Sequence, residues 1–115
     1  MRRLVITLST LGALAGLSMT AAADPAATTV SYSQADLQSP QAIAALHERV
    51  EAAAIDVCRE TNRGAYDYAS AMRSCRAVAT RVAIEQSGID ALSVYHEEAH
   101  LHRRAAAVSA QPAQN

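Results

Sequence analysis

The chain has 115 residues and a formal net charge of −1, and half of its residues are hydrophobic although it contains no Phe and no Trp. This length predicts one small domain, and a near-neutral charge without a basic patch argues against nucleic acid or an anionic membrane as a partner. Burial of apolar surface stabilises a fold by roughly 25 cal/mol per Å², so a core built largely from alanine is thin and needs further stabilisation.

The first 23 residues have the pattern of a secretory signal peptide. Arg2 and Arg3 precede an apolar run over residues 4–19. Small side chains up to Ala23 then provide a cleavage site before Asp24. This run is shorter than the roughly 20 residues that cross a bilayer, so a retained membrane anchor is the weaker alternative. We therefore expect an exported protein, periplasmic or extracellular in a bacterium, without stable membrane insertion after cleavage.

Residues 24–38 are predicted to form an extended arm with one short strand. The segment TTVSYS, residues 28–33, alternates around β-branched and aromatic residues, which is typical of a strand. A lone strand is not stable in water, so it must pack on the helices, pair with another copy or stay mobile. Asp36 is expected to cap or turn the backbone before the first helix, with ligand recognition as the less favoured alternative.

A helical domain is predicted over residues 39–104, and its first helix has the strongest signals. Ser39 is placed as the N-cap and Pro40 as the first helical residue. Apolar residues that recur at steps of three and four predict one buried face. They are Ile43, Leu46, Val50, Ala54 and Val57. The polar residues expected away from this face are His47, Glu48, Glu51 and Asp56.

Two further helices follow. Asn62 and Gly64 mark a turn, after which Asp67 or Ser70 can cap the second helix. Its predicted apolar stripe consists of Met72, Cys75, Ala79 and Val82. Its arginines, Arg73, Arg76 and Arg81, are interpreted as a solvated face rather than an anion site.

The third helical segment begins after Ser87-Gly88, with a possible cap at Asp90. It is predicted to place one set of residues on a common side: Leu92, Tyr95 and Ala99. Residues 105–115 lack a periodic pattern and are predicted to be a flexible tail.

Cys58 and Cys75 are predicted to form a disulfide. In an antiparallel hairpin of the first two helices, the rise per residue brings the two positions roughly level. A redox-active pair or a metal site stays open as an alternative. However, a redox motif usually has two intervening residues, and two cysteines supply only half of a structural zinc site. The loop tyrosines, Tyr66 and Tyr68, are expected to cover the bridge rather than to stack on a ligand.

Three ordered motifs resemble the UrcA family of small secreted bacterial proteins. They are VSYSQADLQSP (residues 30–40), LHERVEAAAIDVC (residues 46–58) and CRAVATRVA (residues 75–83). The first is similar to a family pattern VSYSDLDLSSP, from which Gln34 and Ala35 depart. The resemblance covers most of the chain after the signal peptide. It implies an export signal, a helical hairpin and two paired cysteines, and it carries over no catalytic residue.

The stretch HEEAH, which begins at His96, matches the H-E-x-x-H signature of zinc metallopeptidases. In such an enzyme His96 and His100 would bind the metal, and Glu97 would polarise a water molecule. The nearest further ligand, His102, points away from that helix face, and no spacing argument selects His47 or a carboxylate of the first helix. An alanine-rich hairpin also has few large side chains with which to wall a substrate cleft.

Together these patterns predict an all-α fold, a disulfide-linked antiparallel helical hairpin with a short N-terminal strand or extended arm and a third C-terminal helical segment. We expect a non-enzymatic exported protein, without a cofactor or catalytic residues, that binds an unidentified protein partner or associates with itself. Weak transition-metal binding by His96 and His100 is the alternative, and metallopeptidase activity is a remote third.

Overall fold

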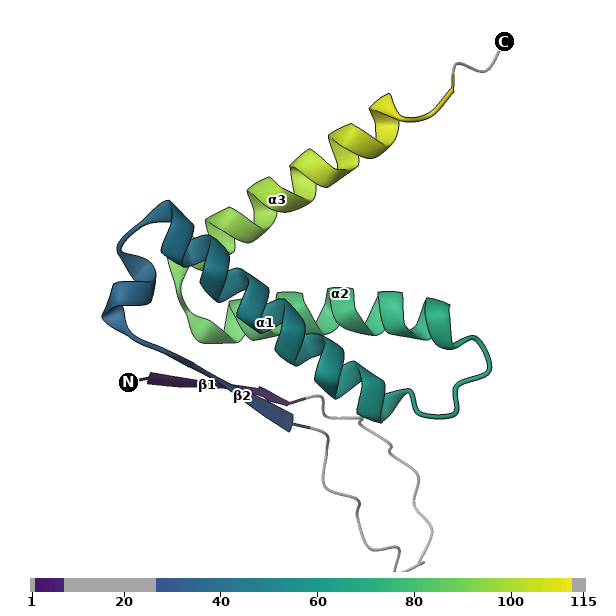
Figure 1. Cartoon of the computed structure of the whole chain (residues 1–115), viewed down its shortest axis with the longest axis horizontal. Helices are drawn as coiled ribbons and strands as arrows, with labels where there is room; N and C mark the ends of the chain where they lie inside the picture. Colours follow the sequence, from purple (N-terminus) through teal and green to yellow (C-terminus); the bar gives the residue numbers. More distant parts are fainter. Residues whose placement is uncertain (1, 8–26, 113–115) are drawn as a thin grey trace, which may run out of the picture.

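A computed structural model describes residues 2–7 and 27–112 of the chain (Figure 1). Within these residues it contains two strands, a short 3₁₀ helix and three α-helices. They are β1 (Arg2–Thr7), β2 (Ala27–Tyr32), η1 (Gln34–Leu37), α1 (Pro40–Thr61), α2 (Tyr68–Ser87) and α3 (Asp90–Ser109). The predicted helical hairpin, with an N-terminal strand and a third helix, is confirmed. None of the helices in these residues is long and apolar enough to cross a membrane.

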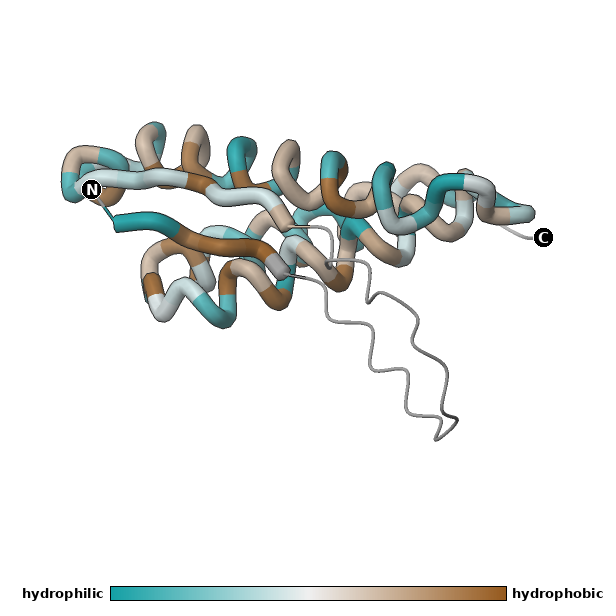
Figure 2. Tube along the Cα trace, turned by 90° about the horizontal axis from the view of Figure 1, so that it is seen from below, coloured by the Kyte–Doolittle hydropathy of each residue, from teal (hydrophilic) through white to brown (hydrophobic). Residues whose placement is uncertain are grey.

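The two strands form a small sheet that the sequence did not predict. Most of the predicted signal peptide, residues 8–23, and its cleavage site before Asp24 lie outside the described residues. Its beginning, however, forms β1, which pairs antiparallel with β2 and places Leu4 opposite Val30. Figure 2 shows the two strands side by side, with the apolar middle of β1 in brown. The strand of the arm is therefore paired within the chain in this structure.

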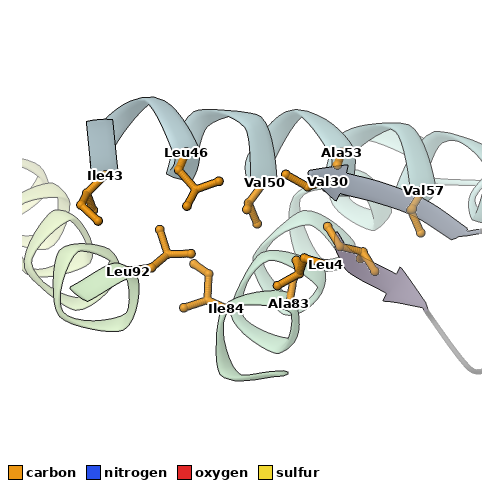
Figure 3. Close-up of a cluster of buried hydrophobic side chains, with 11 residues drawn as sticks. Leu4, Val30, Ile43, Leu46, Val50, Ala53, Val57, Ala83, Ile84 and Leu92 are labelled. Carbon is orange, nitrogen blue, oxygen red and sulfur yellow. The ribbon is translucent and has the colours of Figure 1, made fainter. Parts of the chain in front are cut away.

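One hydrophobic core lies between this sheet and the three helices (Figure 3). Both strands and all three helices contribute buried side chains to it. These are Leu4, Ile6, Val30, Ile43, Leu46, Val50, Ala53, Val57, Ala83, Ile84 and Leu92. The large side chains of this core are aliphatic. Those of the two strands fill part of the space that the small alanines of the helices leave empty.

Helix α1 begins as predicted and buries the predicted face. The Ser39 hydroxyl accepts a hydrogen bond of 3.1 Å from the backbone N–H of Ala42, and Pro40 starts the helix. The prediction for His47 is wrong, because this side chain is only 5% exposed. Helix α3 packs against α1 and covers His47 from a direction that the periodicity of α1 does not reveal.

Helix α2 is capped by Asp67, whose carboxylate accepts a hydrogen bond of 3.1 Å from the Ser70 backbone N–H. It ends at Gly88, which has the left-handed φ of 65° that favours glycine. The predicted stripe is correct at Ala79, whereas Val82 is only half-buried. The buried residues of α2 are Ala79, Thr80, Ala83 and Ile84. The stripe is broader than predicted because α1, β1 and α3 all contact this helix.

Helix α3 differs from its prediction at both ends. Its N-cap position is Ile89, and Asp90 lies in the first turn without a side-chain cap hydrogen bond. The helix continues to Ser109, so part of the predicted tail is helical. Residues 105–107 are alanines, the strongest helix formers, and no stop signal precedes them. Only Leu92 of this helix is buried, and every residue from 100 to 110 is exposed.

The predicted disulfide joins α1 to α2, with 5.7 Å between the Cα atoms of Cys58 and Cys75. Ala54, Ala79 and the half-buried Met72 pack around it. The expected cover by tyrosines is wrong, because Tyr66 is fully exposed. Small alanines let the helices approach closely, so Cys58 is buried and Cys75 is half-buried without aromatic side chains.

Candidate ligand-binding site

Helix α3 diverges from α2 (Figure 1). A cleft of about 650 Å³ lies between these two helices, and Glu51 of α1 contributes to its wall. This volume is typical of pockets that hold small organic molecules. It is lined by Glu51, Arg73, Arg76, Ala77, Val78, Thr80, Arg81, Ile84, Glu85, Ser93, His96, Glu97, His100 and Arg103. The expectation that this sequence has few side chains with which to wall a cleft is therefore wrong. The prediction assumed that bulky aromatic residues are needed for such walls. Here long arginine and glutamate side chains on diverging helices form them.

Two histidines meet where α1 and α3 cross. His47 Nε2 and His96 Nδ1 are 2.9 Å apart, a hydrogen bond in which the tautomers decide which nitrogen donates. The His47 ring also packs edge-on against Tyr95, with 5.1 Å between the ring centroids. His47 is thereby fixed by two residues of α3, and only His96 of the pair lines the cleft.

The surroundings of this pair favour the neutral imidazoles. Burial lowers the pKa of His47 below its ordinary value of 6.5, and the charge of Arg103 lowers it further, whereas Glu51 raises it. Burial likewise lowers the pKa of His96, with additional contributions from Arg103 and His100. A proton on either ring would be poorly solvated and would lie close to the positive charge of Arg103.

The cleft carries arginine charge that its own acidic residues compensate only in part. The carboxylate oxygens of Glu51 lie 3.6 Å from a guanidinium nitrogen of Arg76 and 3.5 Å from one of Arg103, so two arginines share one carboxylate. Arg81 has its own partner, Glu85, at 3.2 Å. Within the described part of the chain Arg73 has no ion-pair partner. The interpretation of the α2 arginines as a simple solvated face is therefore incomplete.

Thr80 adds an unusual polar group to this lining. Its side chain is 2% exposed, and its hydroxyl has no hydrogen-bond partner among the residues that the structure describes. A buried hydroxyl without a partner costs roughly 1–3 kcal/mol, so native structures rarely retain one without a reason.

The HEEAH residues are placed on α3 near the cleft. His96, Glu97 and His100 line it, whereas His102 is exposed and its ring Nδ1 lies 2.8 Å from the backbone oxygen of Glu98. In residues 2–7 and 27–112 no three or more His, Cys, Asp or Glu side chains gather in a way that could hold a metal ion. The histidine that lies against His96 is His47, rather than a residue further along α3.

Asp36 lies outside the cleft and holds the arm in place. Its carboxylate accepts a 2.7 Å hydrogen bond from the Ser33 backbone N–H and forms a 2.9 Å ion pair with Arg49 of α1. The Ser33 hydrogen bond is the main reason that the pKa of Asp36 lies below 3.8, and Arg49 lowers it further. The predicted capping role is confirmed.

Sequence reasoning missed three residues that shape this site. Glu51 and His47 lie one helical turn apart on α1, which was a usable signal that they share a face. Thr80 gave no signal, because a threonine within a helix is common and its burial depends on how the other elements pack against α2. Contacts of this kind depend on helix packing and not on local pattern.

Comparison with known proteins gives no further assignment. No model of a protein family matches the chain, and neither curated proteins nor solved structures include a significant match.

Proposed function

We propose that this chain is an exported, non-enzymatic binding protein similar to the UrcA family, and that its cleft holds a small organic anion. The observation that carries the proposal is the gathering of four arginines in one cleft, whose charge the neighbouring carboxylates compensate only in part. A carboxylate can accept paired hydrogen bonds from a guanidinium group. Ala77 and Val78 of the same lining provide apolar surface for the rest of such a ligand.

Two features support the export part of the proposal. The N-terminal residues follow the basic, apolar and small-residue order of a signal peptide. The Cys58–Cys75 disulfide is of the kind that persists in oxidising compartments and is rare in the cytosol. Mass spectrometry of the exported protein gives the direct test, with a new N-terminus at Asp24 as the expected result.

Three ligands with the same tail test the anion proposal: octanoate, n-octanol and octylammonium. Calorimetric titration of the oxidised protein should give the tightest binding for octanoate, because only its head group complements the arginines. Equal affinity for octanoate and n-octanol would show non-specific apolar binding and contradict the proposal. No detectable binding of octanoate in the millimolar range would contradict it as well.

Two substitutions in the cleft should change the affinity for octanoate in opposite directions, which makes this test sharper. Arg103→Gln should weaken octanoate binding by about tenfold, since it removes a charged hydrogen-bond donor. Glu51→Gln should tighten it a few-fold, because Arg76 and Arg103 lose the carboxylate that they share. Arg104→Gln is the matched control, because this exposed neighbour is not part of the lining and its loss should leave binding unchanged.

Thr80→Val provides an independent test. It keeps the β-branched shape and removes a buried hydroxyl without a partner, so it should leave octanoate binding unchanged and should not reduce the stability of the unliganded protein. A loss of stability would mean that the Thr80 hydroxyl is already satisfied in the free protein.

Weak metal binding remains the second candidate, because His96 and His100 lie one turn apart on α3 and both line the cleft, although no third ligand gathers with them among the described residues. A site that used the His47–His96 pair would have to break its hydrogen bond. Calorimetric titration with Zn²⁺ and Cu²⁺ separates this candidate from the first. Binding that His96→Ala/His100→Ala abolishes would support a metal site, whereas identical weak binding by both proteins would exclude it.

A further inference from the structure

Strand β1 fills a site beside β2 and above α2, called its seat below. The side chains of β1 alternate between the core and solvent. Leu4 and Ile6 are 7% and 2% exposed, whereas Val5 between them is 50% exposed. Leu4 points into the same cluster as Val30, Val57 and Ala83 (Figure 3). Backbone pairing with β2 and two inward aliphatic side chains thus hold β1.

The proposed export of the protein would empty this seat. Residues 2–7 belong to the segment that a signal peptidase would remove. Loss of β1 would uncover apolar side chains of the core and leave β2 with an unpaired edge. An exposed edge beside an apolar surface is a template for the addition of another strand.

The seat itself does not depend on β1 for its position. Helix α1 packs against β2, and the Arg49 guanidinium donates a 2.8 Å hydrogen bond to the backbone oxygen of Ser31. The same guanidinium pairs with Asp36, which fixes the turn after the strand. Strand β2 is therefore anchored to α1 by contacts that remain after cleavage.

We infer that in the processed protein this seat receives an extended segment of another protein, which adds antiparallel to β2. The segment would place two aliphatic side chains, one residue apart, where Leu4 and Ile6 lie, with its intervening side chain in solvent. The inference rests on the proposed cleavage, but not on the proposed anion site. It identifies the kind of protein partner that this chain would bind.

A second copy of the chain does not fit this edge. Two identical antiparallel strands are related by a two-fold axis perpendicular to their sheet. Strand β2 of the second copy would take the place of β1, and its own α1 would then lie beneath it. That space is already filled, because α2 packs beneath β1 in this structure. The occupant is therefore a strand without a helix attached beneath it.

The first test uses the full chain with residues 1–23 retained, refolded under oxidising conditions. Leu4→Asp/Ile6→Asp should expel β1 and accelerate hydrogen exchange at the amides of residues 27–32. A capped hexapeptide of sequence RRLVIT should bind this variant and slow that exchange again, but should not bind the wild-type full chain. Val5→Asp is the matched control, since it adds a charge at the outward position and should leave β1 seated.

The second test uses the processed protein purified from the periplasm, which needs no substitution. It should bind the RRLVIT peptide, and a peptide with aspartate at the position of Ile6 should bind at least about tenfold more weakly. If the processed protein is unfolded alone, the peptide should restore its helical circular dichroism. Failure of the peptide both to bind and to restore structure would overturn the inference.

The two tests also separate this inference from the export proposal. An exported protein that retains residues 1–23 would contradict cleavage, and the seat would then be filled permanently by β1. Peptide binding by the full-length Leu4→Asp/Ile6→Asp variant depends only on the seat. If that variant is folded and does not bind the peptide, the seat cannot accept a strand from another chain, whatever happens at the cleavage site.

Discussion

The hydrogen bond between His47 and His96 joins two helices whose contacting residues are 49 positions apart in the chain. Both imidazoles have a pKa below 6.5, mainly because they are buried, whereas in the unfolded chain they have ordinary values. As the pH falls below about 6.5, the unfolded state binds protons that the folded state excludes. The free energy of unfolding should therefore decrease from about pH 6.5 down to the lowered pKa values and then level off.

Urea unfolding followed by circular dichroism between pH 7.5 and pH 5 measures this dependence. His47→Gln/His96→Gln should flatten the profile in this range, because neither side chain can then take up a proton. His102→Gln is the control, since this ring is exposed and its replacement should leave the slope unchanged. A wild-type profile without a slope over this range would show that the histidine pair is not linked to folding.

Among the helices, those with strong local signals were predictable. The beginning of α1 was visible in Ser39-Pro40, and its buried face was visible in the 3-4 spacing, because capping and periodicity act within one helix. The disulfide was predictable for a related reason, since two helices joined by a short turn bring level positions together.

The remaining features depend on contacts between elements far apart in sequence. The pairing of β1 with β2 links residues that the sequence assigns to separate parts of the protein, the signal peptide and the mature chain. The burial of His47 results from its contacts with α3, and no local pattern defines how α3 packs against α1. For this reason most of the fold was predictable, whereas the cleft was not.

The hairpin of α1 and α2 should depend strongly on its disulfide. Cys58→Ala/Cys75→Ala is expected to lower the free energy of unfolding by about 3 kcal/mol, because the unfolded chain regains the freedom of the closed loop. Urea unfolding of the variant and of the wild type with and without reductant measures this effect. The reduced wild type should resemble the variant, and the variant should not respond to reductant. Equal stability of the oxidised and reduced wild type would contradict the expectation.

At the scale of the whole molecule, the protein is flat, with extents of 52 × 51 × 20 Å. A layer this thin has few positions that are covered on all sides, which is consistent with a core of modest size. Helix α3 extends beyond this core (Figure 1) and is attached to it largely through its first half. The cleft exists only while α3 keeps its place, so ligand binding should be linked to the docking of this helix.

Leu92→Ala tests this link, because Leu92 is the only buried residue of α3. Truncation of a buried leucine costs about 2–5 kcal/mol, and here the cost falls on the contact that docks the helix. We expect a loss of this order in the free energy of unfolding, together with loss of octanoate binding as the cleft loses one wall. Leu101→Ala is the matched control, since this leucine of the same helix is 62% exposed and its truncation should change neither quantity measurably. Octanoate binding that survives Leu92→Ala in spite of the lost stability would mean that the ligand does not lie between α2 and α3.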